Sequence, residues 1–122
     1  MNGIILTQSV GGSGSDANTP IEVTIAPAAT EIINVYDASV CPFITWKVSI
    51  TDMVSFTTTT RFLTIDALHD FEGNADFNCH SIMGVEFDIE IDVDTGTPNT
   101  NLVLSITNNT SIDLEICVIR LF

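Results

Sequence analysis

The chain has 122 residues, of which 16 are Asp or Glu and only three are Lys or Arg, so its formal net charge is −13. Nucleic acids and anionic membrane surfaces both bind through clustered Lys and Arg, and this composition argues against either partner. No apolar run approaches the roughly 18 residues of a membrane span, and no basic residue precedes the first apolar patch, which argues against a secretory signal. The length predicts a single domain, large enough to form a stable hydrophobic core without disulfides or bound metal ions.

The first 20 residues differ in composition from the rest and predict an extended N-terminal arm. Residues 11–18 are rich in Gly and Ser, as in flexible linkers, and cannot fold alone. A short apolar patch precedes them and is the candidate partner-binding site: Ile4, Ile5, Leu6 and Val10. We expect this patch to dock on a neighbouring subunit, to add a strand to a sheet edge, or to fold back on its own domain.

From residue 21 onward the pattern is that of β-strands, with turn residues between short apolar runs and no convincing helix. The expected strands cover residues 21–25, 31–36, 43–51, 57–66, 75–83, 85–93, 102–107 and 112–121. Short strands at this spacing predict an all-β domain over residues 21–122, an antiparallel β-sandwich or jelly roll of about eight strands. Trp46 alternates with Val48 and Ile50 and is expected in the core between two sheets.

Apolar and acidic residues alternate without a break over residues 85–94. Because side chains of a strand point to opposite faces in turn, one face carries only apolar residues and the other only acids. The apolar set is Val85, Phe87, Ile89, Ile91 and Val93; the acidic set is Glu86, Asp88, Glu90, Asp92 and Asp94. The pattern predicts a strand with one buried face and a row of five carboxylates.

Two residue groups could be taken for metal sites. Asp92, Asp94 and Gly96 look like a fragment of a calcium loop, but the third ligand and the Glu at position twelve of an EF-hand are missing. The second group contains residue types that bind zinc, namely His69, Asp70, Cys79 and His80. Adjacent strand residues face opposite ways, and the close Cys pairs of structural zinc sites are missing, so we expect no metal or other cofactor.

Catalysis is also a minor hypothesis. His69 and Asp70 could combine with a distant Ser or with Cys79, but no Gly-x-Ser-x-Gly elbow or cysteine-protease signature occurs. Carboxylates of the acidic row lie about 6.6–7 Å apart on an open face, whereas a general acid needs a dry pocket. We therefore expect a protein without enzymatic activity.

The three cysteines, Cys41, Cys79 and Cys117, lie in or beside apolar runs. An odd count in a domain of this size favours free, buried thiols, although one pair could still be bridged.

Several short motifs follow one another over residues 43–122. Trp46 opens a strand that ends in Thr-Asp at residues 51–52, and Leu68-His69-Asp70 follows. Next come the acidic strand and two closing strands, Leu-Val-Leu-Ser-Ile-Thr at 102–107 and Ile-Cys-Val-Ile-Arg at 116–120. In order and spacing this part of the chain resembles a family of small β-sandwich modules in virion proteins of tailed bacteriophages, of the marine and cyanobacterial type. One departure is that residues 71–72 separate His69-Asp70 from the glycine that follows directly in the family pattern.

The resemblance implies a structural virion component, most simply a capsid decoration (cement) protein that binds the outer head shell and stabilises it through its N-terminal arm. Its expected partners are the major capsid protein and copies of itself, as in a trimer. It would be assembled in the cytoplasm of a bacterial host, which suits unpaired cysteines. The alternatives are a tail, neck or fibre component built on the same module, and a carbohydrate- or calcium-binding jelly roll.

Overall fold

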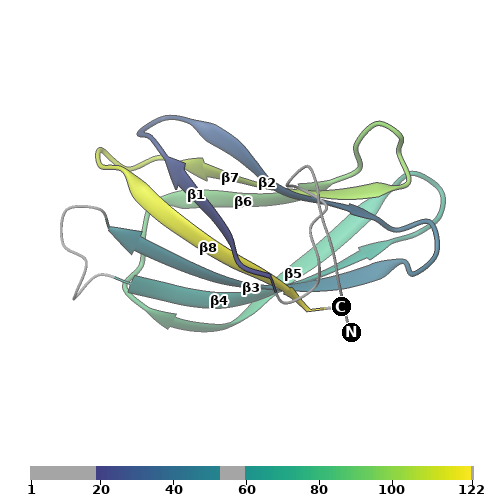
Figure 1. Cartoon of the computed structure of the whole chain (residues 1–122), viewed down its shortest axis with the longest axis horizontal. Coiled ribbons are helices and arrows are strands. Elements are labelled where there is room, and N and C mark those ends of the chain that lie inside the picture. Colours follow the sequence, from purple (N-terminus) through teal and green to yellow (C-terminus); the bar gives the residue numbers. More distant parts are fainter. Residues whose placement is uncertain (1–18, 53–59, 122) are drawn as a thin grey trace.

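The computed structural model describes residues 19–52 and 60–121. Within them, eight antiparallel strands form two sheets that pack face to face (Figure 1). The strands are β1 (Ile21–Ile25), β2 (Thr30–Asp37), β3 (Phe43–Asp52), β4 (Thr60–His69), β5 (Ala75–Gly84), β6 (Ile89–Asp94), β7 (Asn101–Asn108) and β8 (Leu114–Leu121). The predicted all-β sandwich is confirmed, whereas most of the predicted N-terminal arm lies outside the described residues.

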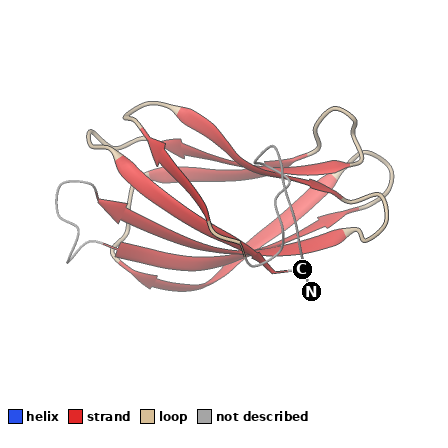
Figure 2. Ribbon diagram, viewed as in Figure 1, coloured by secondary structure: helices blue, strands red, loops and turns tan. Residues whose placement is uncertain are grey.

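The two sheets differ in size. One has the strand order β1-β8-β3-β4-β5 and the other the order β2-β7-β6. Strands β3, β4 and β5 follow one another as a meander and β6 and β7 form a hairpin, while the chain crosses between the layers after β1, β2, β5 and β7 (Figure 2). Each crossing brings strands that are distant in sequence side by side, as where β8 lies between β1 and β3.

The core lies between the two sheets and follows the alternation of the sequence. Trp46, Val48 and Ile50 of β3 are fully buried, as predicted, and they belong to the same core cluster as Leu102, Leu104 and Ile106 of β7. Each fully buried large aliphatic side chain stabilises the fold by about 1.5–3 kcal/mol. Trp46 also carries a polar N–H into this layer, where it donates a hydrogen bond to Asn34 Oδ1 at 3.0 Å.

A β-bulge in β2 explains how Asn34 reaches the core. The pairing with β7 moves from Ile32–Ser105 to Asn34–Leu104, so one extra residue, Ile33, is inserted in β2. As a result Ile33 and Asn34 are both buried although they are adjacent. A bulge of this kind changes which side chains face inward and bends the strand.

A second bulge lies in β5. The pairing moves from Phe62–Met83 to Thr64–His80, and Ser81 within the bulge has a φ of 54°. Before the bulge Phe77 and Cys79 pack against the core, whereas beyond it Ile82 and Met83 are 48% and 61% exposed. The end of β5 therefore places apolar side chains in solvent.

The acidic strand is shorter than the sequence predicts. All five acids are exposed and Val93 is buried, as predicted, but Val85, predicted on the buried face, is 39% exposed. Only Ile89–Asp94 pairs with a neighbour. Residues 85–88 carry the chain from β5 in the larger sheet to β6 in the smaller one. Single backbone hydrogen bonds hold the two ends of this crossing: Val85 N–H donates to Thr60 O, and Asp88 O accepts from Asn109 N–H.

Candidate functional surfaces

The predicted partner-binding residues cannot be placed in the fold. Ile4, Ile5, Leu6 and Val10 all lie outside the described residues. Among the described residues, the buried hydrophobic core extends from Ile25 to Val118, and Ile21 and Val23 pack against it. The N-terminal patch therefore stays a prediction from the sequence.

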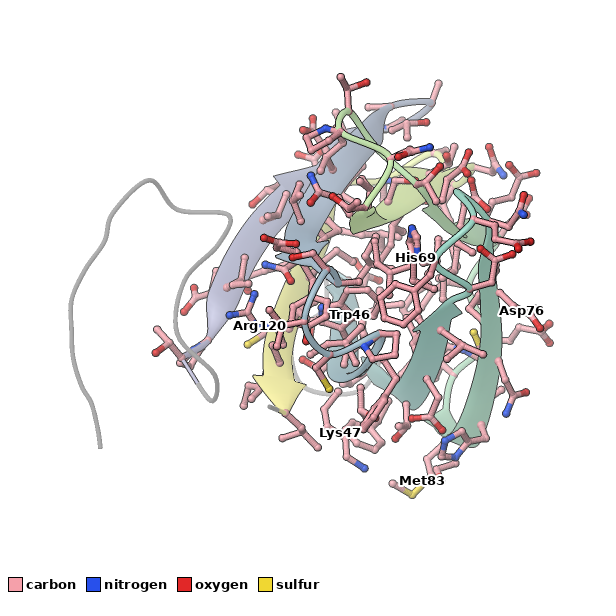
Figure 3. All side chains as sticks on the ribbon, turned by 90° about the vertical axis from the view of Figure 1, so that its right-hand side faces the viewer. Trp46, Lys47, His69, Asp76, Met83 and Arg120 are labelled. Atoms are coloured by element: carbon pink, nitrogen blue, oxygen red, sulfur yellow. The ribbon has the colours of Figure 1, made fainter. Side chains whose placement is uncertain are left out.

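His69 forms a latch between two loops at one end of the sandwich, where Figure 3 shows it between the sheets. Its Nδ1 accepts a hydrogen bond from the backbone N–H of Phe71 at 2.9 Å. Its Nε2 lies 2.6 Å from the carbonyl oxygen of Asn99, and since a carbonyl only accepts, Nε2 carries the proton. The ring thus ties the β4–β5 turn to the β6–β7 loop and has no nitrogen left for a metal or a nucleophile.

Asp70 organises the turn next to this latch. Its Oδ1 accepts from the backbone N–H groups of Glu72 and Asn74, and its Oδ2 accepts from the side-chain amide of Asn74. These hydrogen bonds favour the ionised form and lower the pKa of Asp70. Residues 71 and 72 lie within this turn, with Phe71 at a φ of 64°.

The imagined zinc set is not brought together. Cys79 faces the core opposite Ile65, while its neighbour His80 faces outward, as expected for adjacent strand residues. His69 and Asp70 are engaged in the latch and its turn. Among the described residues no group of three His, Cys, Asp or Glu side chains could hold a metal ion.

A polar network that the sequence did not reveal lies on the outward face of the larger sheet. His80 Nε2 and Asp66 Oδ2 are 2.7 Å apart, and Thr45 donates its hydroxyl to Asp66 Oδ1 at 2.7 Å. These bonds hold the pKa of Asp66 below its usual value, the Thr45 hydrogen bond being the largest cause. Ser81 Oγ lies 3.0 Å from His80 Nδ1, so the side chains of Ser81, His80 and Asp66 are connected one after another at hydrogen-bonding distances.

This Ser–His–Asp arrangement differs from a hydrolytic triad in its exposure to solvent. The side chains of His80 and Asp66 are 42% and 51% exposed, whereas a catalytic acid–base pair is tuned by burial. Lys47, next to the network, donates to Thr64 Oγ1 and lies over the ring of Phe62. The cluster therefore acts as an ordered polar patch on an open face. Outward positions on β3, β4 and β5 could have indicated it had the strand register been known.

Exposed apolar side chains surround this network. Phe43 and Leu68, directly opposite each other on β3 and β4, are 53% and 51% exposed and line a shallow hollow of about 280 Å³. Met83 lies at the other side, and Figure 3 shows it and Lys47 pointing away from the core. The outward face of the larger sheet thus combines apolar contact area with hydrogen-bonded polar groups, as protein interfaces do.

The outward face of the smaller sheet is different in charge. Here β6 contributes Glu90, Asp92 and Asp94, all exposed, beside β7 and β2. All three cations of the chain, Lys47, Arg61 and Arg120, lie in strands of the larger sheet. A hollow of about 510 Å³ lies on this acidic face. The two sheets therefore present surfaces of contrasting chemistry.

The calcium-loop fragment serves as a turn. Asp94 Oδ1 accepts the N–H of Thr95 at 2.8 Å, and the chain then folds back over the sheet. A Cβ at Gly96 would come within 2.8 Å of Val103 Cγ2, so glycine permits this close approach. The aspartate thus contributes to the loop in the way turn-forming residues commonly do.

The three cysteines are free and partly buried. Burial is the main cause that raises the pKa of Cys79 and Cys117, and Cys117 also lies near Glu22 and Glu115. No disulfide joins the three cysteines in this structure, and each thiol is partly shielded from solvent rather than fully buried.

No family model and no curated protein matches the chain. Among the described residues, no helix has the length and apolar character to cross a membrane.

Proposed function

We propose that this protein is a non-enzymatic structural component of a tailed-phage virion, and specifically a decoration protein that stabilises the head shell. The resemblance of residues 43–122 to small virion modules motivates the proposal, and the β-sandwich is the fold that this resemblance implies. A tail, neck or fibre component built on the same module is the alternative.

The observation that carries the proposal is the outward face of the larger sheet. Half-exposed Phe43 and Leu68 flank a network in which Asp66 and His80 are held in place by hydrogen bonds. Neighbouring half-exposed apolar side chains favour a contact site, and side chains that are already ordered lose little entropy on binding. In a decoration protein this face packs on the shell protein or on another copy of the chain.

Two functional elements follow for the proposed assembly. The N-terminal patch, Ile4 to Leu6 with Val10, reaches a neighbouring subunit and anchors the domain. The acidic surface of the smaller sheet keeps many copies from associating in the wrong way, because like charges repel. The large negative charge of the chain supports this role.

The first test is the number of copies in purified virions, measured by quantitative mass spectrometry together with labelling of the protein on the particle. A decoration protein is present in hundreds of copies on the head. A handful of copies located on the tail would instead support a tail, neck or fibre component. Absence from the virion would overturn both the decoration and the tail proposals.

A second test separates the two proposed contacts. Deleting residues 1–12 should abolish binding to undecorated heads while circular dichroism and the melting temperature stay unchanged. The double variant Phe43→Ser with Leu68→Ser should weaken head binding, whereas Ile32→Ser, a similar change on the smaller sheet, should not. Full head binding by the deletion variant would remove the anchoring role of the N-terminal patch.

A further inference from the structure

The hollow on the smaller sheet has two different walls. On β2, Ile32 and Val35 project outward, and Ile32 is 63% exposed. The opposite wall, on β6, consists of Asp92 and Asp94. Between them, Ser105 and Val103 of β7 form the floor. The hollow thus has one apolar and one acidic side.

The β2 bulge creates this arrangement. Ile32 and Val35 are three residues apart, yet they pair with Ser105 and Val103, which are two apart, because Ile33 is the inserted residue. Two straight rows therefore cross the sheet, Ile32–Ser105–Asp92 and Val35–Val103–Asp94. Strands lie about 4.8 Å apart, so the two walls are about 10 Å apart, which leaves room for one extended chain between them.

The negative charge of the hollow determines which kind of extended chain can bind in it. The carboxylates of Asp92 and Asp94 are in no ion pair with any described residue, and β2, β6, β7 and the loop 95–100 contain no Lys or Arg at all. A second copy of this chain is a poor occupant, because its net charge of −13 repels the same surface. A basic segment is attracted to it instead.

The spacing of the two carboxylates further limits which basic segments fit the hollow. Asp92 and Asp94 are two residues apart on one strand, which is about 6.6–7 Å. Alternate side chains of an extended peptide have the same spacing, so Lys or Arg at positions i and i+2 can pair with both carboxylates. The aliphatic stems of these residues can lie on the apolar groups of the hollow, as long cationic side chains commonly do.

We propose that the hollow between β2 and β6 binds an extended segment of a partner protein that carries Lys or Arg at alternate positions. This contact surface is distinct from the N-terminal patch and from the face of the larger sheet, and it does not depend on attachment to a phage head.

The probe is the peptide acetyl-Lys-Thr-Lys-Thr-Lys-Thr-amide, titrated into the full-length protein and followed by NMR at low salt. The expected shift changes lie at residues 30–35, 92–97 and 101–105. Acetyl-Lys-Lys-Thr-Thr-Lys-Thr-amide has the same composition and charge but no two Lys at positions i and i+2, and it should bind more weakly. A saturable response centred elsewhere, or equal affinity for both peptides, would overturn the proposed site.

Matched variants separate the site from the overall charge. Asp92→Asn with Asp94→Asn removes two carboxylates from the hollow and should weaken binding about tenfold, since each exposed ion pair contributes up to about 1 kcal/mol. Glu22→Gln with Asp113→Asn removes two exposed carboxylates elsewhere and should change affinity less than about twofold. Equal losses in the two double variants would show attraction by net charge alone and contradict the proposal.

Discussion

Trp46 donates its indole N–H to the side-chain oxygen of Asn34 at 3.0 Å, and both residues are fully buried between the two sheets. The bond joins β3 of the larger sheet to the bulge in β2 of the smaller sheet. A buried donor without a partner is costly, so this single contact couples the position of the bulge to the placement of the only tryptophan.

Replacing Asn34 should therefore destabilise the fold by more than a surface change does. In Asn34→Leu the indole N–H loses this acceptor, and we expect the free energy of unfolding to fall by about 1–3 kcal/mol. Urea denaturation followed by tryptophan fluorescence measures it. Asn78→Leu, at an exposed position of β5, is the control and should stay within about 0.5 kcal/mol of the wild type.

The His69 latch gives a second prediction. His69→Phe keeps a ring in the buried site but removes the hydrogen bonds to Asn99 O and Phe71 N–H, and should cost about 2 kcal/mol. Hydrogen exchange at the Phe71 amide should accelerate together with exchange in the β6–β7 loop. His80→Phe, on the open face, should change stability by less than about 1 kcal/mol. Equal effects of the two substitutions would argue against the latch.

Asp70 makes stability depend on acid pH. Its pKa in the folded protein is lowered by its hydrogen bonds to the turn, chiefly that from the Asn74 side chain. The ionised carboxylate therefore stabilises the fold above the unfolded-state pKa of about 3.9, and this contribution is lost as pH falls through the lower folded-state value. Urea midpoints of the wild type and Asp70→Ala should differ at neutral pH and converge in acid. A difference that is independent of pH would exclude this linkage.

Gly84 should tolerate no side chain. It has a φ of 91°, and a Cβ would lie 2.1 Å from the carbonyl oxygen of Thr60, a backbone atom on the neighbouring strand. We expect Gly84→Ala to lower stability by roughly 2 kcal/mol or more. Gly96→Ala meets only the end of the Val103 side chain and should cost less. Thermal unfolding of both variants compares the two, and the reverse order would contradict this account.

Thiol chemistry tests the state of the cysteines. Cys79 and Cys117 have a raised pKa because they are shielded from water, so their thiolate fraction at neutral pH is small. In urea the protein should react with three equivalents of a disulfide reagent, and in the native state these two should react slowly. Rates should increase as pH rises. A count of one thiol under denaturing conditions would instead indicate a disulfide.

The alternation of the sequence determined the faces of the strands. Trp46, Val48 and Ile50 are buried and the acids of residues 85–94 are exposed, because the period of two is a local property of extended backbone. The sequence pattern did not show that strand pairing in β6 begins only at Ile89, because this start depends on where the chain crosses from one sheet to the other.

Only the tertiary structure decided which residues meet. His69 and Asn99 are 30 residues apart in sequence, and Asp66 and His80 are 14 apart. Their contacts depend on strand order and register, which no local pattern encodes. The bulges at Ile33 and Ser81 shift that register by one residue each and so reverse which side chains face outward. Composition alone fixed the excess of acids, but the sandwich placed all three cations in strands of the larger sheet and left the strands of the smaller sheet without Lys or Arg.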